Sequence, residues 1–342
     1  RCRCGGCIET APGPMKLFEG ARYSVDFAID VAGTKYNQHN PLERQVRTMR
    51  WEGLVVESQT LWDQLERLAR LLAPGYEALI RYVLSQSVIG SDETRWPLLG
   101  KKDPARWHAW SLVAPDAVAY RILEGRSTEE ARTVLGGYKG IVMCDGYAVY
   151  KSLAATEGFS LAHCWSHVRR EFIKAERSFP AEAKTMLDWI RGLYLVEAKC
   201  KPGAAGDAER LAKRQAEAKP ICTRIREVAD EMYKSAVPGS SLEDALEYMA
   251  GLWSGLVRYL EDPRIPIDNN HTERAERGVV VGRKNHYGSR SRRGTEVAAL
   301  FYSFIESAKL CGIDPKGYLR AATMAALRGE RIPLPHEVAA QG

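Results

Sequence analysis

Three acidic residues stand where the sequence predicts strand ends or the start of a helix. Asp92 lies near the end of a predicted strand, Asp145 directly follows an apolar run, and Glu273 follows a helix-capping Asp-Asn-Asn run. Carboxylate oxygens are preferred ligands of Mg²⁺ and Mn²⁺, and two close carboxylates repel unless a cation lies between them. If the strands carrying Asp92 and Asp145 pair in one sheet, the acids predict a divalent-cation site.

Each acid also has a simpler structural interpretation. Asp92 is explained as an exposed strand-end acid, and Asp145 begins a common Asp-Gly turn dipeptide. Glu273 follows Asn270 by one helical turn and would then close a capping box. Glu276, nearly one turn later, lies on a similar helix face and is a rival ligand. Residue types and spacing leave these alternatives open.

Positive charge is moderate overall but concentrated locally. The 342 residues carry a net charge of +6, which permits nucleic-acid binding without requiring it. The stretch 283–293 holds five Lys or Arg residues, no acid, and the aromatic side chains of His286 and Tyr287. It is interpreted as a basic loop that contacts phosphate, the alternative being a solvated loop. The cations that would contact a nucleic acid, if the chain binds one, are Arg169, Arg170, Arg274, Arg277, Arg283, Lys284, Arg290, Arg292 and Arg293.

Hydrophobic periodicity predicts an α/β protein, a mixed sheet flanked by helices, with strands near 88–94, 108–113, 117–123, 140–144 and 160–162. A helix over 42–51 and a second one capped by Ser58, with leucines at helical spacing to residue 72, fit a helix-turn-helix. The predicted segments are a partial zinc knuckle (1–14), a helix-turn-helix region (15–82), a core in two parts (83–178 and 257–310), an all-α insertion (179–256) and a C-terminal tail (311–342).

The eight cysteines are too scattered for a disulfide framework, which indicates a reducing compartment. Cys4 and Cys7 form one C-x-x-C pair, which is half of a four-ligand zinc site. A second zinc site built from Cys164 and the histidines around it is a weaker alternative. No apolar run approaches the length of a bilayer span, and no signal peptide is recognisable. Because the chain begins at Arg1, we interpret it as a piece of something longer.

An ordered set of motifs along the whole chain resembles the DDE transposases of the insertion-sequence-66 family. The motifs are SDET at 91–94, CDGYAVY at 144–150, HCWSHVRREF at 163–172, PIDNN at 266–270 with Glu273-Arg274, VGRKN at 281–285 and CGIDPKGYL at 311–319.

The resemblance implies a ribonuclease-H-like catalytic core with a helical insertion between the second Asp and the Glu. It implies that Asp92, Asp145 and Glu273 are the catalytic residues and hold Mg²⁺ or Mn²⁺. Two such ions, about 3.5–4 Å apart, clamp an in-line displacement. Hydrolysis would free a 3′-hydroxyl that then attacks target DNA. Glu276 departs from the family, whose members usually carry an apolar residue there.

The same resemblance implies DNA as the partner, both the inverted-repeat ends of an element and its target. It implies a homodimer or larger synaptic complex, accessory proteins of the same element, no membrane, and a bacterial cytoplasm with nucleoid association. An upstream cysteine pair would complete the zinc site of Cys4 and Cys7. Two other functions stay open: a catalytically inert DNA-binding protein derived from a transposase, and another ribonuclease-H-like nuclease such as a junction resolvase. The helix-turn-helix and the Asn-rich Glu motif count against the latter.

Overall fold

The computed structural model describes residues 13–99, 106–201 and 203–341, so Cys4 and Cys7 lie outside the described residues. No helix in the described part of the chain combines the length and apolar character that crossing a bilayer requires. The strands are β1 (Val88–Arg95), β2 (His108–Val113), β3 (Val118–Leu123), β4 (Ile141–Cys144) and β5 (Ser160–His163). The α-helices are α1 (Val25–Tyr36), α2 (Leu42–Trp51), α3 (Ser58–Leu84), α4 (Thr128–Leu135), α5 (Ala148–Glu157), α6 (Trp165–Ala175), α7 (Pro180–Ala198), α8 (Asp207–Lys213), α9 (Lys219–Ser235), α10 (Ser241–Leu256), α11 (Asn270–His286), α12 (Arg292–Leu310), α13 (Pro315–Leu327) and α14 (Pro335–Ala339).

The five strands form one mixed sheet in the order β3-β2-β1-β4-β5. β1, β2 and β3 pair antiparallel, whereas β4 pairs parallel with both β1 and β5. The pairing of β1 with β4 ends at Gly90 and Met143, so Asp92 and Asp145 each follow that last pair by two residues. Because side chains alternate along a strand, Asp92 projects from the same face as Gly90, whereas Asp145 follows the end of β4. The predicted mixed α/β architecture is confirmed.

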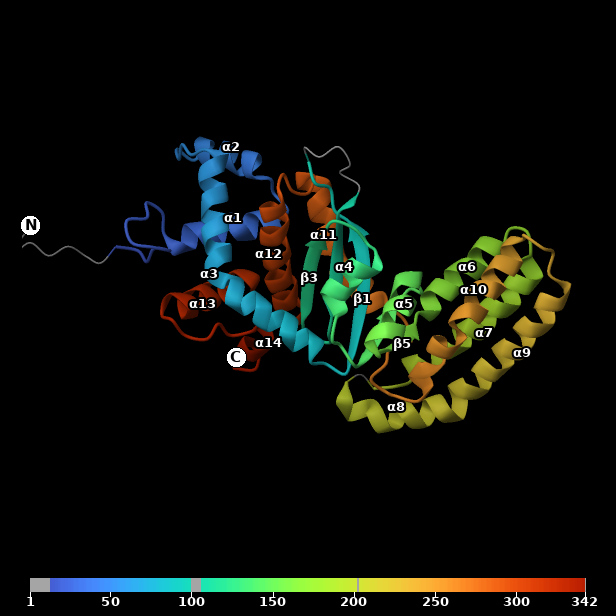
Figure 1. The fold of residues 1–342 in the computed structure, drawn as a ribbon. Coiled ribbons are helices and arrows are strands. Elements are labelled where there is room, and N and C mark those ends of the chain that lie inside the picture. Colours follow the sequence, from blue (N-terminus) through green and yellow to red (C-terminus); the bar gives the residue numbers. More distant parts are fainter. Residues whose placement is uncertain (1–12, 100–105, 202, 342) are drawn as a thin grey trace, which may run out of the picture.

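The described part of the chain builds two hydrophobic cores. Figure 1 shows the N-terminal helices with α12 and α13 on one side of the sheet and the helices α6 to α10 on the other. The first core joins the sheet to the N-terminal helices and to α12 and α13. The second lies under the helical insertion, where α6, α7, α9 and α10 pack together. β4 contributes to both, because Val142 and Cys144 belong to the first core and Met143 to the second.

Helix α12 covers the open edge of the sheet. Ser307 Oγ accepts a hydrogen bond from Val118 N at 2.9 Å, and Ser303 Oγ accepts one from Tyr120 N at 2.9 Å. Ser303 and Ser307 are one helical turn apart and so present a row of hydroxyls to β3. Unpaired strand edges invite pairing with other chains, and these hydroxyls satisfy backbone groups that the edge would otherwise expose.

The N-terminal region contains the expected helix α2, but its partner differs from the expectation. α3 is 27 residues long, and Ser58 is its first residue and not its N-cap, which is Glu57. The leucine stripe that predicts the helix continues as buried Leu79 and Val83, which explains why α3 runs on through Pro74. A long helix packed on the sheet replaces the short second helix of the prediction.

Helix α11 approaches the sheet so closely that one position requires glycine. A Cβ placed on Gly90 of β1 would overlap Thr272 Oγ1 and lie 3.2 Å from Asn269 Oδ1. The absent side chain therefore lets the first turn of α11 lie directly on β1. This contact fixes where Glu273, the residue after Thr272, stands relative to Asp92.

We expect Gly90→Ala to lower the free energy of unfolding by about 1–3 kcal/mol, because Thr272 or the whole of α11 must move to admit the methyl group. Urea denaturation measures the change. The matched control is Gly33→Ala in α1, where an added Cβ meets nothing within 4 Å. There we expect a gain of up to about 1 kcal/mol from helix propensity. Equal stability of Gly90→Ala and wild type would show that the contact is not tight.

Candidate active site

The face of β1 that carries Asp92 lies under α11 along its whole length. Gly90 contacts Thr272 near the start of the helix, and Thr94 accepts a hydrogen bond at 2.8 Å from Arg283 Nη1 near its end. Asp92 lies between these two contacts. Its partner on the neighbouring strand β2 is Ser111, whose hydroxyl lies 3.1 Å from the Asp92 carbonyl oxygen.

Glu93 projects from the opposite face of β1 and is a site residue that sequence reasoning missed. The Tyr150 hydroxyl of α5 donates to Glu93 Oε2 at 3.0 Å and lies 3.2 Å from Ser91 Oγ. Burial raises the pKa of Glu93 to about 7, and the charges of Asp145 and Asp92 act in the same direction. Its position directly after Asp92 was the available signal, and strand alternation explains why the two side chains diverge.

Asp145 begins a tight turn at the end of β4. Its Oδ1 accepts a hydrogen bond from Tyr147 N at 2.9 Å, and its carbonyl oxygen accepts one from the Tyr248 hydroxyl of α10. Gly146 has a φ of +99°, and a Cβ there would press on Leu252 of the same helix. Asp145 thus accepts a backbone hydrogen bond just after the strand, and the insertion contacts this strand end directly.

An open cavity of about 460 Å³ lies between β1, α6 and α11. It is lined by Asp92, Glu93, His167, Arg170, Glu273, Glu276, Arg277, Val280 and Val281. Two of the three predicted acids, Asp92 and Glu273, thus share one cavity wall. Asp145 is not among the lining residues, although its charge acts on Asp92.

Negative charge accumulates at Asp92. Burial is the main cause that raises the pKa of Asp92 to about 7, followed by the charge of Asp145 and then that of Glu273. The Arg170 guanidinium opposes the shift and does not cancel it. A carboxylate held among like charges in a half-buried site is stabilised by any cation that enters. The donor set consists of oxygens, which fits Mg²⁺ or Mn²⁺.

The Glu273 side chain points toward α6. Its Oε1 lies 3.6 Å from His167 Nε2 and 3.7 Å from Arg170 Nη2. The capping-box interpretation of Glu273 is wrong, because the N-cap of α11 is Asn269 and its side chain makes no capping hydrogen bond. Burial lowers the pKa of His167, so Arg170 supplies the positive charge. Within the described residues, no three His, Cys, Asp or Glu side chains form a ready-made metal-binding group.

Glu276 lies deeper than the other acids. It is 9% exposed, and its Oε1 lies 3.0 Å from Ser111 Oγ. Burial is the main cause that raises the pKa of Glu276 to about 9, with the charge of Asp92 adding to it. The Ser111 hydroxyl donates to Glu276 Oε1 and lies within hydrogen-bond distance of the Asp92 carbonyl oxygen, so its one hydrogen serves both acceptors. Glu276 thus supports the backbone of Asp92 from the side facing α11.

The predicted DNA-contacting cations fall into two groups. Arg283 donates to Thr94 Oγ1 and to the Arg95 carbonyl oxygen, so it ties α11 to β1. Ion pairs also hold Arg170, Arg290, Arg292 and Arg293. No ion pair with another described residue holds Arg169, Arg274, Arg277 or Lys284.

The predicted basic loop is largely ordered secondary structure. Residues 283–286 complete α11, and α12 begins at Arg292. Between them the chain is fixed to the end of β1, since Ser289 N donates to the Pro97 carbonyl at 3.0 Å and Trp96 Nε1 donates to Ser289 Oγ at 3.1 Å. The basic loop expected over 283–293 is therefore reduced to a short turn between His286 and Arg292, anchored to the residues after β1.

The alternative zinc site at Cys164 has no support in the geometry. Cys164 Sγ accepts a hydrogen bond from Asn269 N at 3.1 Å, and burial raises the pKa of its thiol to about 11. Cys164 precedes α6, and its protonated thiol is buried against the start of α11, where it acts as a packing residue.

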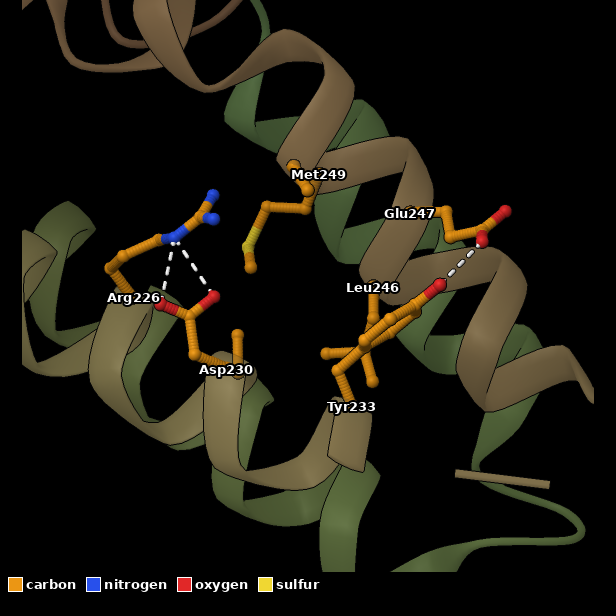
Figure 2. Close-up of a pocket in the computed structure, with 8 residues that line it drawn as sticks. Arg226, Asp230, Tyr233, Leu246, Glu247 and Met249 are labelled. Atoms are coloured by element: carbon orange, nitrogen blue, oxygen red, sulfur yellow. Dashed lines mark hydrogen bonds and ion pairs between the residues drawn. The ribbon is translucent and has the colours of Figure 1, made fainter. Parts of the chain in front are cut away.

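A second cavity, of about 250 Å³, lies in the insertion between α9 and α10 (Figure 2). Its polar residues are paired with one another: Arg226 with Asp230, and the Tyr233 hydroxyl with Glu247 at 2.8 Å. Leu246 and Met249 form its apolar wall. In the cavity between β1, α6 and α11, in contrast, not every carboxylate is paired with a cation. This cavity, called the strand-end cavity below, is the candidate active site.

The sequence matches one family model and several curated proteins over most of its length. The family model described as "Transposase IS66 family" matches residues 20–297. Among curated proteins of Sinorhizobium fredii, uncharacterized protein y4jD is 31% identical over 93% of this chain, and uncharacterized protein y4hP is 27% identical over 93%. The chain spans 66% and 62% of the lengths of these two relatives.

Replacing Glu276 by Gln should make stability less dependent on pH. The folded state keeps the Glu276 proton up to about pH 9, whereas the unfolded chain loses it near pH 4.5. Wild-type stability therefore falls across this window, by up to about 1 kcal/mol per pH unit from this one group. Urea denaturation of Glu276→Gln in chelator should show a growing advantage over wild type as pH rises. Glu52→Gln, at an exposed position, is the control, and parallel pH profiles for wild type and Glu276→Gln would contradict the assignment.

Proposed function

The chain belongs to the IS66 family of transposases, and we propose that it cleaves and joins DNA strands at the ends of an insertion sequence. The observation that carries this proposal is the strand-end cavity, where the charges of Asp145 and Glu273 help to raise the pKa of Asp92. Because the chain spans about two thirds or less of its relatives, the activity of the whole protein is part of the proposal.

The order and directions of the strands support a ribonuclease-H-like core. Three antiparallel strands followed by two parallel ones bring the ends of β1 and β4 to the same place. The chain between β5 and α11 forms a helical insertion with its own hydrophobic core, as the proposed architecture requires.

We propose Asp92, Asp145 and Glu273 as the residues that hold Mg²⁺ or Mn²⁺. When bound, the ions would activate the attacking hydroxyl and stabilise the leaving oxygen. Glu273 must first leave Arg170. The two side chains are 34% and 52% exposed at a distance of 3.7 Å, and such a pair contributes less than about 1 kcal/mol. A rotation of Glu273 toward Asp92 therefore costs little.

The other cavity residues have separate tasks in this proposal. A cation held by Asp92 would favour its ionised form, so binding would release a proton near neutral pH. Glu276 and Ser111 hold the Asp92 backbone in place. Arg277 and the released Arg170 stand at the cavity rim, where a guanidinium binds a phosphodiester oxygen. His167, neutral at pH 7, supplies a ring nitrogen for hydrogen bonding next to Glu273.

The N-terminal segments extend the proposal. Residues 15–82 are proposed to bind DNA, and residues 1–14 to belong to a zinc knuckle completed by upstream cysteines. The second candidate function is an inert DNA-binding protein. The presence of all three acids, Asp92, Asp145 and Glu273, is the reason for proposing the catalytic function first.

We expect Asp145→Asn to bind DNA with wild-type affinity and to nick it at least about 100-fold more slowly in Mg²⁺, since one carboxylate of the proposed ion site is lost. A nicking assay on plasmid or linear DNA bearing inverted repeats measures both. Asp188→Asn, an exposed acid on the insertion, is the matched control and should nick normally. Normal nicking by Asp145→Asn would refute the catalytic assignment, and wild type that binds but never nicks would favour the inert alternative.

Lys284→Ala should weaken DNA binding and reduce the slope of log affinity against log salt by about 0.9, the value for one released counterion per phosphate contact. Arg283→Ala should instead lower the free energy of unfolding, because Arg283 bonds Thr94 and the β1 backbone. Fluorescence anisotropy at several salt concentrations gives the slopes. Lys234→Ala on α9 is the control and should leave the slope unchanged; an unchanged slope for Lys284→Ala would remove it from the interface.

A further inference from the structure

A third cavity, of about 440 Å³, lies where α1, α2 and α3 meet the turn between α11 and α12. Its size falls in the range of sites for small molecules, about 300–1,000 Å³. It lies at the C-terminal end of α11, whereas Glu273 lies near the N-terminal end. With a helix rise of about 1.5 Å per residue, the two sites are about 20 Å apart.

The cavity has an excess of positive charge. Four cations line it, Lys35, Arg44, Arg47 and Arg290, against the carboxylate of Glu43. Glu43 lies 3.5 Å from Arg290, and its charge also acts on Lys35, so this one carboxylate faces four cations. No ion pair with a described residue holds Lys35, Arg44 or Arg47. Burial lowers the pKa of Lys35 to about 8, which indicates a cation poorly solvated by water. An anion would stabilise it.

Aromatic side chains and a helix terminus complete the wall. Trp62 of α3 and the exposed Tyr287 both line the cavity. Ser291 and Gly294, at the N-terminus of the 19-residue helix α12, line it too, and helix N-termini attract anions. His286 is held in place by the Tyr302 hydroxyl at 3.0 Å and so belongs to the scaffold.

We propose that this cavity binds an unpaired nucleotide of the DNA that the protein acts on, with the base stacked on Trp62 and the phosphate held by Lys35. A planar anion satisfies both the aromatic wall and the unpaired cations, whereas an acidic peptide would use the cations alone. The proposal rests on the proposed function. A distance of about 20 Å corresponds to about six nucleotides of one strand at 3.4 Å each, so one DNA molecule reaches both sites.

The test compares two labelled probes, a blunt duplex and the same duplex with a short single-stranded extension of about six nucleotides. Fluorescence anisotropy at fixed ionic strength gives both affinities. We expect wild type to prefer the extended duplex about 10-fold, and Trp62→Ala to bind both probes alike, as expected when one base-aromatic stack is lost. Trp189→Ala, a partly buried tryptophan of the insertion, is the matched control and should keep the preference.

Lys35→Met is the second variant, for the case that Trp62→Ala fails to fold in a thermal melt. It should also lose most of the preference. Equal binding of both probes by wild type, or a preference that survives in Lys35→Met, would overturn the inference. So would competition by a poly-glutamate peptide as strong as that by a single-stranded oligonucleotide of equal charge. Each of these results leaves the proposed function standing, because that proposal depends on Mg²⁺-dependent nicking by wild type.

Discussion

The close approach of α11 to β1 at Gly90 is the constraint on which the candidate active site depends. Without a side chain at this position, the first turn of α11 rests on the strand, and Thr272 and Asn269 fill the space. From this one contact the rest of the helix follows β1 as far as Thr94, where Arg283 bonds it. Two residues separated by most of the chain, Asp92 and Glu273, therefore come to line one cavity.

The same packing brings several carboxyl groups close together without enough nearby positive charge to neutralise them. Asp92 and Glu93 are partly buried and Glu276 is buried, all near one another, and the pKa of each carboxyl is raised. Structural ion pairs normally neutralise such a group, as Glu197 does for the buried Arg214. At the strand ends the cation that acts on Asp92, Arg170, is half-exposed and paired with Glu273. Uncompensated charge of this kind marks sites that act on a ligand more often than sites that hold the fold.

Much of this arrangement could be predicted from sequence, and the limits are physical. Strands and most helices follow from local periodicity, so the apolar run before Asp145 identified β4 correctly. The antiparallel and parallel partners of β1 are long-range pairings that no local pattern contains. The direction of a side chain depends on neighbours brought by the fold. Glu273 looked like a capping residue because its spacing is right, yet Arg170 and His167 of α6 attract it instead. The basic stretch looked like a loop because the anchors that order it, Trp96 and Pro97, lie far away in sequence.

Strand β4 belongs to both hydrophobic cores, and this has a consequence for how the protein varies over evolution. Met143 packs under the insertion and Cys144 packs toward the opposite core, and Tyr248 of the insertion bonds the backbone of the next residue, Asp145. The insertion is thus not structurally independent of the sheet, because it shares packing and a hydrogen bond with the end of β4. Because Tyr248 and Leu252 of α10 lie against Asp145 and Gly146, we expect substitutions that change the volume of α10 to be tolerated best together with changes at this strand end.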